Sequence, residues 1–372
     1  MSKLRFLSSR FVLFTIILSV IIGNSLMGLS DNQKESLGQI FGENQLNPQS
    51  STDPSSPVLL AVDSVLNDTY SSAANYYYQT GSKAAASYYH VFWVQPADSG
   101  WTQNLYVYAD PTYSTLMNSS TGSAGQLNWV LGRSSVGRDY YPRVAASQGG
   151  YGYFGWLNST DYITLSQGRR SGALDADTCM DIYQVTLTSG SAVSFSLRVP
   201  LGTDFNLYLY HLDLNSTAGS THYIRASTSF IPGGDEDIIG FVPTVSDTYL
   251  LVVARKSGSG TYYLQGYNHT LTDDTQWPGR IDEYMNYYYQ TGNVSASKYQ
   301  VVWLRPVLAS RNFELYLYSD SAYSSLLASS TKGSGLLDWV VMYPNTSRSY
   351  YVKAFGVPGS SGDSWLEWEG AD

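Results

Sequence analysis

The chain has 372 residues, enough for two or three domains at about 150 residues each. Only 14% of the residues are charged, whereas Tyr and Gly each occupy 33 positions, a balance that favours strands and turns over helices. The formal net charge of −9 and the lack of any basic run exclude nucleic acid as a partner.

The chain begins with a predicted secretory signal over residues 1–28. An apolar run over 11–22 follows three basic residues, Lys3, Arg5 and Arg10. This run is shorter than the roughly 20 residues of a spanning helix, which favours cleavage after Ser25 or Gly28. The alternative is an uncleaved anchor, the only contact with a membrane that the sequence predicts.

Residues 29–69 are mostly polar and without a sustained period, so they predict a flexible low-complexity stalk. The protein is therefore expected to be secreted and to lie at the extracellular cell surface. Asn-X-Ser/Thr acceptors for N-glycosylation agree with export and are expected on the surface: Asn67, Asn118, Asn158, Asn215, Asn268, Asn293 and Asn345.

Most of the remaining sequence is repeated. The run NYYYQTG at 75–81 returns at 286–292, and five further runs then recur at an offset of 210, including VFWVQP as VVWLRP and LYVYAD as LYLYSD. A middle segment follows the same order less closely, with DIYQVTL at 181–187 aligned to SKYQVVW at 297–303. Three modules are predicted, over 70–160, 161–272 and 280–372.

Each module is expected to be an antiparallel β-sandwich. In LYLYHLDL, Leu207 and Leu209 face one side of a strand and Tyr208 and Tyr210 the other, which gives an aliphatic inner face and an aromatic outer face. Turn residues separate such runs, and no long segment has a helical period, so the fold class is all-β. One or two helical turns are expected only within 61–78 and 281–289.

The middle module carries an ordered set of short motifs: Asp181 and Tyr183 at a strand start, a Ser-Gly turn, the strand VSFSLRV, Gly-Thr-Asp before NLYLY, and DTYLLVV before GSGTYYLQ. This pattern resembles the pre-peptidase C-terminal domain of secreted bacterial and archaeal proteases. The resemblance implies a jelly-roll-like sandwich used for binding or spacing. The outer modules resemble it more distantly, with Ser87 and Ser297 aligned to Asp181.

No catalytic constellation is found, so the protein is expected not to be an enzyme. The histidines, His90, His211, His222 and His269, form no close metal-ligand pair, and no nucleophile elbow or P-loop occurs. The single cysteine, Cys179, is predicted to be a small buried apolar residue.

Acidic residues of the middle module are the only candidates for a cofactor site. Asp175, Asp177, Asp181 and Asp204 could ligate calcium, which related modules use, and a second acidic cluster spans 235–237. The alternative is that these acids are solvated turn residues and that no cofactor binds.

The tryptophans divide into two groups. Trp93, Trp129, Trp303 and Trp339 recur in both outer copies and are expected in cores. The tryptophans without a repeat partner are the candidates for ligand contacts: Trp101, Trp277, Trp365 and Trp368.

Two functions remain open. The first is a structural or adhesive surface protein that associates with itself or with other envelope proteins. The second is an accessory protein that binds extracellular glycans or matrix for separately encoded enzymes.

Overall fold

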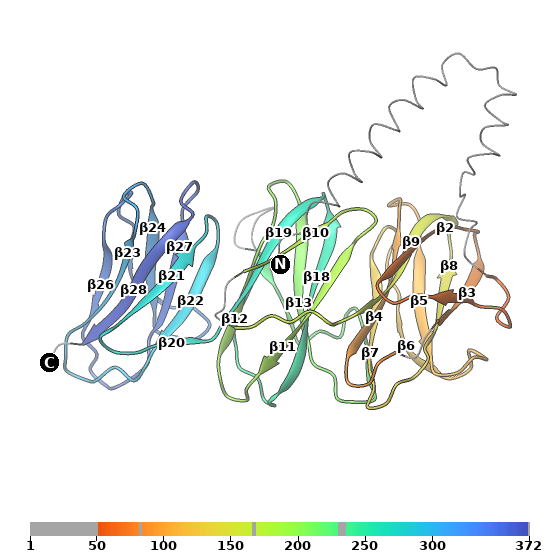
Figure 1. Cartoon of the computed structure of the whole chain (residues 1–372), viewed down its shortest axis with the longest axis horizontal. Helices are drawn as coiled ribbons and strands as arrows, with labels where there is room; N and C mark the ends of the chain where they lie inside the picture. The colour runs from red at the N-terminus through yellow and green to blue at the C-terminus, as the bar shows by residue number, and fades with distance from the viewer. Residues whose placement is uncertain (1–50, 82–83, 166–168, 230–235, 371–372) are drawn as a thin grey trace, which may run out of the picture. The chain divides into compact units, whose positions relative to one another are not determined.

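The computed structural model describes residues 51–81, 84–165, 169–229 and 236–370, so the predicted signal and the first part of the predicted stalk lie outside the described residues. The described residues form 28 strands and no α-helix. The strands follow one another in three groups along the chain (Figure 1). No helix in these ranges is long and apolar enough to cross a membrane. The all-β prediction is confirmed.

Each group of strands makes a two-sheet sandwich, and we call its sheets A and B. In module 1, sheet 1A has the order β1 (Val58–Leu60), β3 (Ala74–Thr80), β8 (Tyr141–Ala146), β5 (Gln103–Tyr108) and β6 (Leu116–Ser120). Sheet 1B has the order β7 (Asn128–Arg133), β4 (Tyr89–Pro96), β9 (Gly150–Asn158) and β2 (Ser64–Tyr70).

Module 2 repeats this plan with a different set of strands. Sheet 2A has the order β11 (Met180–Leu187), β18 (Asp247–Ser257), β13 (Asp204–Tyr210) and β15 (Arg225–Ala226). Sheet 2B has the order β10 (Arg170–Leu174), β19 (Gly260–Tyr267), β12 (Val193–Arg198), β17 (Glu236–Phe241) and β16 (Thr228–Ser229).

Module 3 reproduces module 1 strand for strand. Sheet 3A has the order β20 (His269–Leu271), β22 (Asn286–Thr291), β27 (Tyr351–Gly356), β24 (Phe313–Tyr318) and β25 (Leu326–Ser330). Sheet 3B has the order β21 (Thr275–Ile281), β28 (Gly362–Gly370), β23 (Gln300–Pro306) and β26 (Asp338–Met342). Even the left-handed turns match, since Tyr113 and Tyr323 have φ of 53° and 52°.

Three aliphatic and aromatic cores fill the spaces between the A and B sheets. Leu207 and Leu209 of β13 are buried in the core of module 2, and Leu315 and Leu317 of β24 are buried in that of module 3. The predicted alternation is therefore confirmed, because period-two strands send alternate side chains to opposite faces.

Two predictions about the module starts are wrong. The predicted stalk reaches residue 69, but β1 and β2 already belong to module 1, and β2 pairs with β9 from Ser64 to Tyr70. The helical turns expected within 61–78 and 281–289 are strands as well. These segments are extended because their backbone groups complete the ladders of neighbouring strands, a long-range pairing that local composition does not reveal.

The predicted alignment of 181–187 with 297–303 is also wrong. In module 2, β18 lies between β11 and β13, and in module 3, β27 lies between β22 and β24. Strand β11 therefore takes the place of β22, the NYYYQT strand, and β12 takes the place of β23.

Candidate functional site

Modules 1 and 2 share a fourth hydrophobic core. The outer face of sheet 1B contributes Tyr89, Val91, Trp93, Trp129 and Leu131, and the outer face of sheet 2A contributes residues of three strands: Met180, Ile182, Tyr210, Leu250, Val252 and Ala254. Cys179 is buried in this core too, as predicted, and burial raises the pKa of its thiol to about 12. Burying two sheet faces against each other is the ordinary way a sandwich removes apolar area from water.

Hydrogen bonds fix the register of this junction. The indole Nε1–H of Trp129 donates to the hydroxyl of Tyr210 at 3.0 Å, and the hydroxyl of Tyr89 donates to the carbonyl of Thr248 at 2.9 Å. A further strand, β14 (Ser216–Gly219), leaves module 2 and pairs with the edge strand β7 of module 1. The junction therefore joins the two modules through side chains and through a shared sheet.

The junction between modules 2 and 3 combines aromatic packing with buried polar contacts, since Tyr267 of β19 packs against Tyr287 and Tyr288 of β22. The buried carboxylate of Asp237 on β17 accepts hydrogen bonds of 2.7 Å from the Nδ2 of Asn286 and from the hydroxyl of Tyr288, both on β22. Burial raises the pKa of Asp237, against the lowering effect of these donors. Arg198 and Glu283 add an ion pair of 3.2 Å across the same junction.

The outer face of sheet 3B carries the repeat partners of the residues by which sheet 1B packs against module 2. Tyr299, Val301, Trp303, Trp339 and Val341 occupy the positions of Tyr89, Val91, Trp93, Trp129 and Leu131. Trp129 is 6% exposed, whereas Trp339 is 45% exposed; Tyr89 is fully buried, whereas Tyr299 is 63% exposed. The same kind of surface is thus covered in module 1 and open to solvent in module 3.

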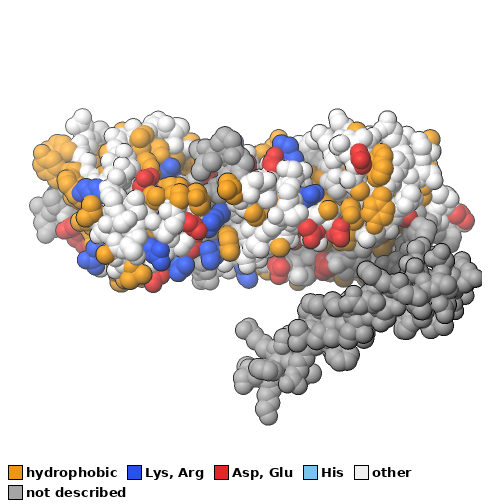
Figure 2. All heavy atoms as spheres, turned by 90° about the horizontal axis from the view of Figure 1, so that it is seen from above, with side chains coloured by type: hydrophobic (Ala, Val, Ile, Leu, Met, Phe, Trp, Pro, Cys, Tyr) orange, Lys and Arg blue, Asp and Glu red, His pale blue; other side chains and the backbone are white. Residues whose placement is uncertain are grey.

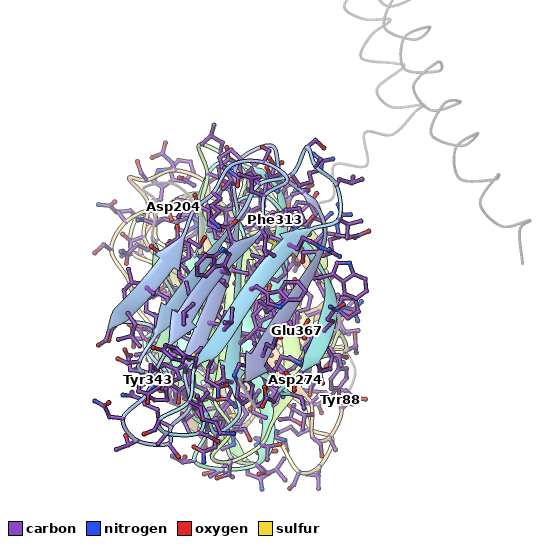
Figure 3. The ribbon with its side chains drawn as sticks, turned by 90° about the vertical axis from the view of Figure 1, so that its left-hand side faces the viewer. Tyr88, Asp204, Asp274, Phe313, Tyr343 and Glu367 are labelled. Atoms are coloured by element: carbon purple, nitrogen blue, oxygen red, sulfur yellow. The ribbon has the colours of Figure 1, made fainter. Side chains whose placement is uncertain are left out.

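This open surface, which we call the 3B face, is the candidate functional site. In Figure 2, hydrophobic side chains gather at the end of the molecule formed by module 3. Figure 3 looks onto sheet 3B, with Tyr343 and Glu367 labelled. The ring of Tyr343 lies 4.8 Å from that of Tyr299, and the ammonium of Lys332 lies 4.9 Å from the ring of Trp339. Exposed aromatic and aliphatic groups with a few charges at the margin are typical of protein interaction sites.

The tryptophan predictions are partly overturned here. Trp93 and Trp129 are buried as predicted, but Trp339 is exposed. Of the predicted ligand-contact residues, Trp368 is buried in the core of module 3 and donates to Gln300 at 2.7 Å. Its ring faces inward because neighbouring residues of β28 alternate between faces.

The other three candidates do not form one site. Trp101 is half-buried and packs over Gly150 in module 1, where a Cβ would lie only 2.0 Å from the indole. Trp277 is half-buried against the core of module 3, whereas Trp365 is half-buried on the outer side of β28 and so lies on the 3B face. The repeat gave no signal for Trp339, since its sequence environment is that of the buried Trp129.

The predicted calcium ligands are not brought together. Asp175 caps a turn by accepting the N–H groups of Asp177 and Thr178, Asp181 accepts the hydroxyl of Tyr262 at 2.7 Å, and Asp204 pairs with Lys256 at 2.9 Å. Within the described ranges, no three His, Cys, Asp or Glu side chains form a group that could hold a metal ion. Asp237 of the second acidic cluster serves the junction with module 3 instead.

The seven glycosylation acceptors are placed unevenly. Asn67, Asn215, Asn268, Asn293 and Asn345 are exposed, and Asn158 is half-buried. Asn118 is half-buried as well, and its Nδ2, the atom to which a glycan would be attached, donates to the carbonyl of Thr217 at 3.1 Å.

A groove near the first junction is a second candidate site. Its volume is about 430 Å³, and its walls carry the rings of Trp129, Tyr208 and Tyr223. The rings of Trp129 and Tyr208 lie 5.5 Å apart, and those of Tyr208 and Tyr223 lie 5.3 Å apart. Amide and cationic side chains complete the lining: Gln95, Gln126, Asn206, Arg255 and Lys256.

No protein-family model and no curated protein matches the sequence. Among solved structures, the chain is similar to the pre-peptidase C-terminal domain of a collagenase from Bacillus anthracis, with 21% identity, 28% of this chain and 92% of that chain covered, and a TM-score of 0.24. It is also similar to a chain of Sulfolobus Turreted Icosahedral Virus, with 10% identity, 82% and 90% covered, and a TM-score of 0.21. A protein from Eubacterium rectale that is assigned as secreted has 15% identity, 54% and 72% covered, and a TM-score of 0.20.

Proposed function

We propose that this chain is a secreted, non-enzymatic structural or adhesive protein of a cell surface, and that it associates with copies of itself through the 3B face. The observation that carries the proposal is the contrast between Trp339 and Trp129. Equivalent positions hold equivalent apolar residues, yet only those of module 1 are covered. Solvent-exposed sheet faces of this kind favour association, because docking removes their apolar area from water.

Export and a surface location are part of the same proposal. The basic and apolar start of the chain supports export, and the polar segment up to residue 57 supports a spacer before the first strand. Tandem sandwiches joined by buried junctions suit a load-bearing or adhesive role, since relative module motion is restrained where an interface is apolar and hydrogen-bonded.

Sedimentation velocity of the purified full chain tests the association. All samples should contain the same detergent, because residues 11–22 are apolar. The unchanged chain is expected to form larger species as its concentration rises, and Trp339→Asp is expected to remain monomeric. Leu201→Asp is the matched control, because Leu201 is an exposed apolar residue of module 2 away from the 3B face. An unchanged chain that stays monomeric, or a Trp339→Asp variant that associates equally well, would contradict the proposal.

Saccharide binding in the groove near the first junction is the second candidate. Sugar rings stack on aromatic faces while amides and cations bind their hydroxyl and acidic groups, and the groove offers both kinds of side chain. Glycan-array binding that is lost in Tyr223→Ala and kept in Tyr151→Ala, an exposed tyrosine of β9, would favour this function. Equal binding by both variants would exclude the groove.

A further inference from the structure

The two junctions inside the chain pair the same kinds of sheet face in the same order. The outer face of sheet 1B covers the outer face of sheet 2A, with the bond from Trp129 to Tyr210 between them. The outer face of sheet 2B then covers the outer face of sheet 3A, with Asp237 bound to Tyr288. In each case a B face meets the A face of the following module.

Two outer faces are left at the ends of this series within the described chain, the 3B face and the outer face of sheet 1A, which we call the 1A face. We propose that the 3B face of one copy binds the 1A face of a second copy. This inference rests on the proposed self-association and names the surface that the 3B face takes as its partner. The contact continues the B-to-A order of the two internal junctions.

The 1A face keeps the groups that bind a carboxylate in module 3. Asn286 and Tyr288, which hold Asp237, correspond to Asn75 and Tyr77 in the repeated run NYYYQTG. Asn75 is exposed and Tyr77 is half-buried, so both can reach a partner. A carboxylate that receives these two donors would be bound as Asp237 is bound.

A cation completes the resemblance between the two A faces. The ammonium of Lys353 lies 4.4 Å from the ring of Tyr316 in module 3, and the guanidinium of Arg143 lies 4.4 Å from the ring of Tyr106 in module 1. Lys353 acts electrostatically on Asp237, whereas the Nε of Arg143 is buried and has no hydrogen-bond partner in the described chain. The 1A face therefore offers a cation beside two hydrogen-bond donors, and the Nε of that cation has no hydrogen-bond partner among the described residues.

The 3B face supplies a matching carboxylate. Glu369, which is exposed, lies directly opposite Val301 on the outer side of β28, and Glu367, which is buried, lies directly opposite Trp303 on the same side. At the same two places sheet 1B has Gly155 and Leu157, which suit the apolar 2A face that it covers. Glu369 is thus an accessible charge on the B face that is left to bind the 1A face, at a place where the B face that binds an apolar A face has Leu157.

This contact joins two different surfaces, so each copy keeps one free face after binding, and the pair has a free face at either end. Heterologous contacts that do not close into a ring generate open chains of copies. A contact between two 3B faces would instead close after two copies, which gives the test its discrimination.

The test mixes two variants that each lack one face, again as full chains under one set of conditions. Trp339→Asp is designed to abolish binding through the 3B face. Asn75→Asp combined with Arg143→Glu is designed to abolish binding through the 1A face. Each variant alone is expected to sediment as a monomer, and an equimolar mixture is expected to form a dimer that does not grow with concentration. The unchanged chain and the control Arg225→Glu, an exposed cation of module 2, should both form larger species.

Each alternative result separates the inference from the proposed function. If the 1A variant alone still dimerises, the 3B faces bind each other, and the inference fails while self-association stands. If the mixture stays monomeric although the unchanged chain associates, the inference fails as well. If the unchanged chain never associates, both fail.

Two further variants keep the result independent of folding defects. Asn75→Asp alone changes an exposed residue and is expected to weaken association severalfold, with an unchanged circular dichroism spectrum. Glu369→Lys placed in the same chain as Arg143→Glu is expected to restore association, because the opposite charges are exchanged between the two faces. Failure of this exchange to restore any association would overturn the assignment of Glu369 to the contact.

Discussion

The guanidinium of Arg133 in module 1 forms a two-pronged ion pair with the carboxylate of Asp247 in module 2, with N–O distances of 2.7 and 3.0 Å. The same guanidinium donates to the carbonyl of Leu212 at 2.9 Å, and the ring of His211 lies within 2.9 Å of Asp247. The repeat partner of Arg133 is Tyr343, which lies exposed on the 3B face. The same position of the repeat therefore joins two modules in module 1 and faces solvent in module 3.

Acid is expected to weaken this ion pair. The hydrogen bonds from Arg133 hold the pKa of Asp247 well below its usual range. A carboxyl whose pKa is lower in the folded state stabilises the fold above its unfolded pKa of about 3.9, and that contribution disappears as the pH falls toward the folded value. The melting temperature of Asp247→Asn should therefore lie below that of the unchanged chain at pH 7, and the gap should narrow below about pH 4. A gap of constant size across this range would show that the ionised carboxylate is not the stabilising group.

Truncating the two equivalent tryptophans is expected to have unequal effects. Trp129→Ala should lower the free energy of unfolding by about 3 to 5 kcal/mol, because it leaves a cavity in the shared core and removes the hydrogen bond that the Tyr210 hydroxyl accepts. Trp339→Ala should change it by no more than about 1 kcal/mol in the monomer, because that side chain is largely in solvent. Urea denaturation followed by tryptophan fluorescence measures both. Equal losses would mean that the two environments are the same.

The charge of Asp237 is expected to be dispensable for the second junction. Burial raises its pKa, so the ionised form is disfavoured in the fold, while the donors Asn286 and Tyr288 need only an acceptor oxygen. Asp237→Asn keeps such an oxygen and should be as stable as the unchanged chain, or more stable, at pH 7. Asp237→Ala removes it and should lose about 1 to 3 kcal/mol, since two buried donors become unpaired. Thermal unfolding at pH 7 compares the two variants, and a greater loss in Asp237→Asn would contradict this account.

Glycan occupancy should follow the placement of the acceptor amides. Asn345 and Asn293 are exposed, whereas the Nδ2 of Asn118 is engaged with Thr217 of module 2. We expect glycans at the first two residues and none at Asn118 in protein secreted by a glycosylating host. Mass spectrometry of intact glycopeptides measures occupancy at each site. A glycan on Asn118 in folded protein would mean that β14 does not stay paired with β7.

Much of the fold could be predicted from particular residues. The alternation of Leu207 and Leu209 with Tyr208 and Tyr210 predicted both the strand and the buried face, and the repeated NYYYQTG run predicted twin modules. The sequence does not predict the first strand of module 1 or of module 3, because β1 and β20 are only three residues long and show no hydrophobic alternation of their own. They are strands because β3 and β22 offer a free edge for parallel pairing.

The candidate site could not be predicted in the same way. The sequence predicts one role for Trp129 and Trp339, since their neighbours along the chain are alike, and it favours exposure of the tryptophans without repeat partners. Those tryptophans are buried or half-buried by their own modules. The exposure of Trp129 and Trp339 depends on whether another module packs against them. The residues next to a tryptophan in the sequence do not reveal this.

The sequence by itself determined that this chain forms all-β modules, that two of them are copies, and which side of each central strand is aliphatic. Those properties depend on side-chain periodicity, which is a local physical constraint. Only the tertiary structure decided that Tyr210 faces Trp129, that Asp237 meets Tyr288, and that Trp339 lies open to solvent. These relationships depend on which sheet faces pack together, because burial is a property of the partners around a residue and not of the residue alone.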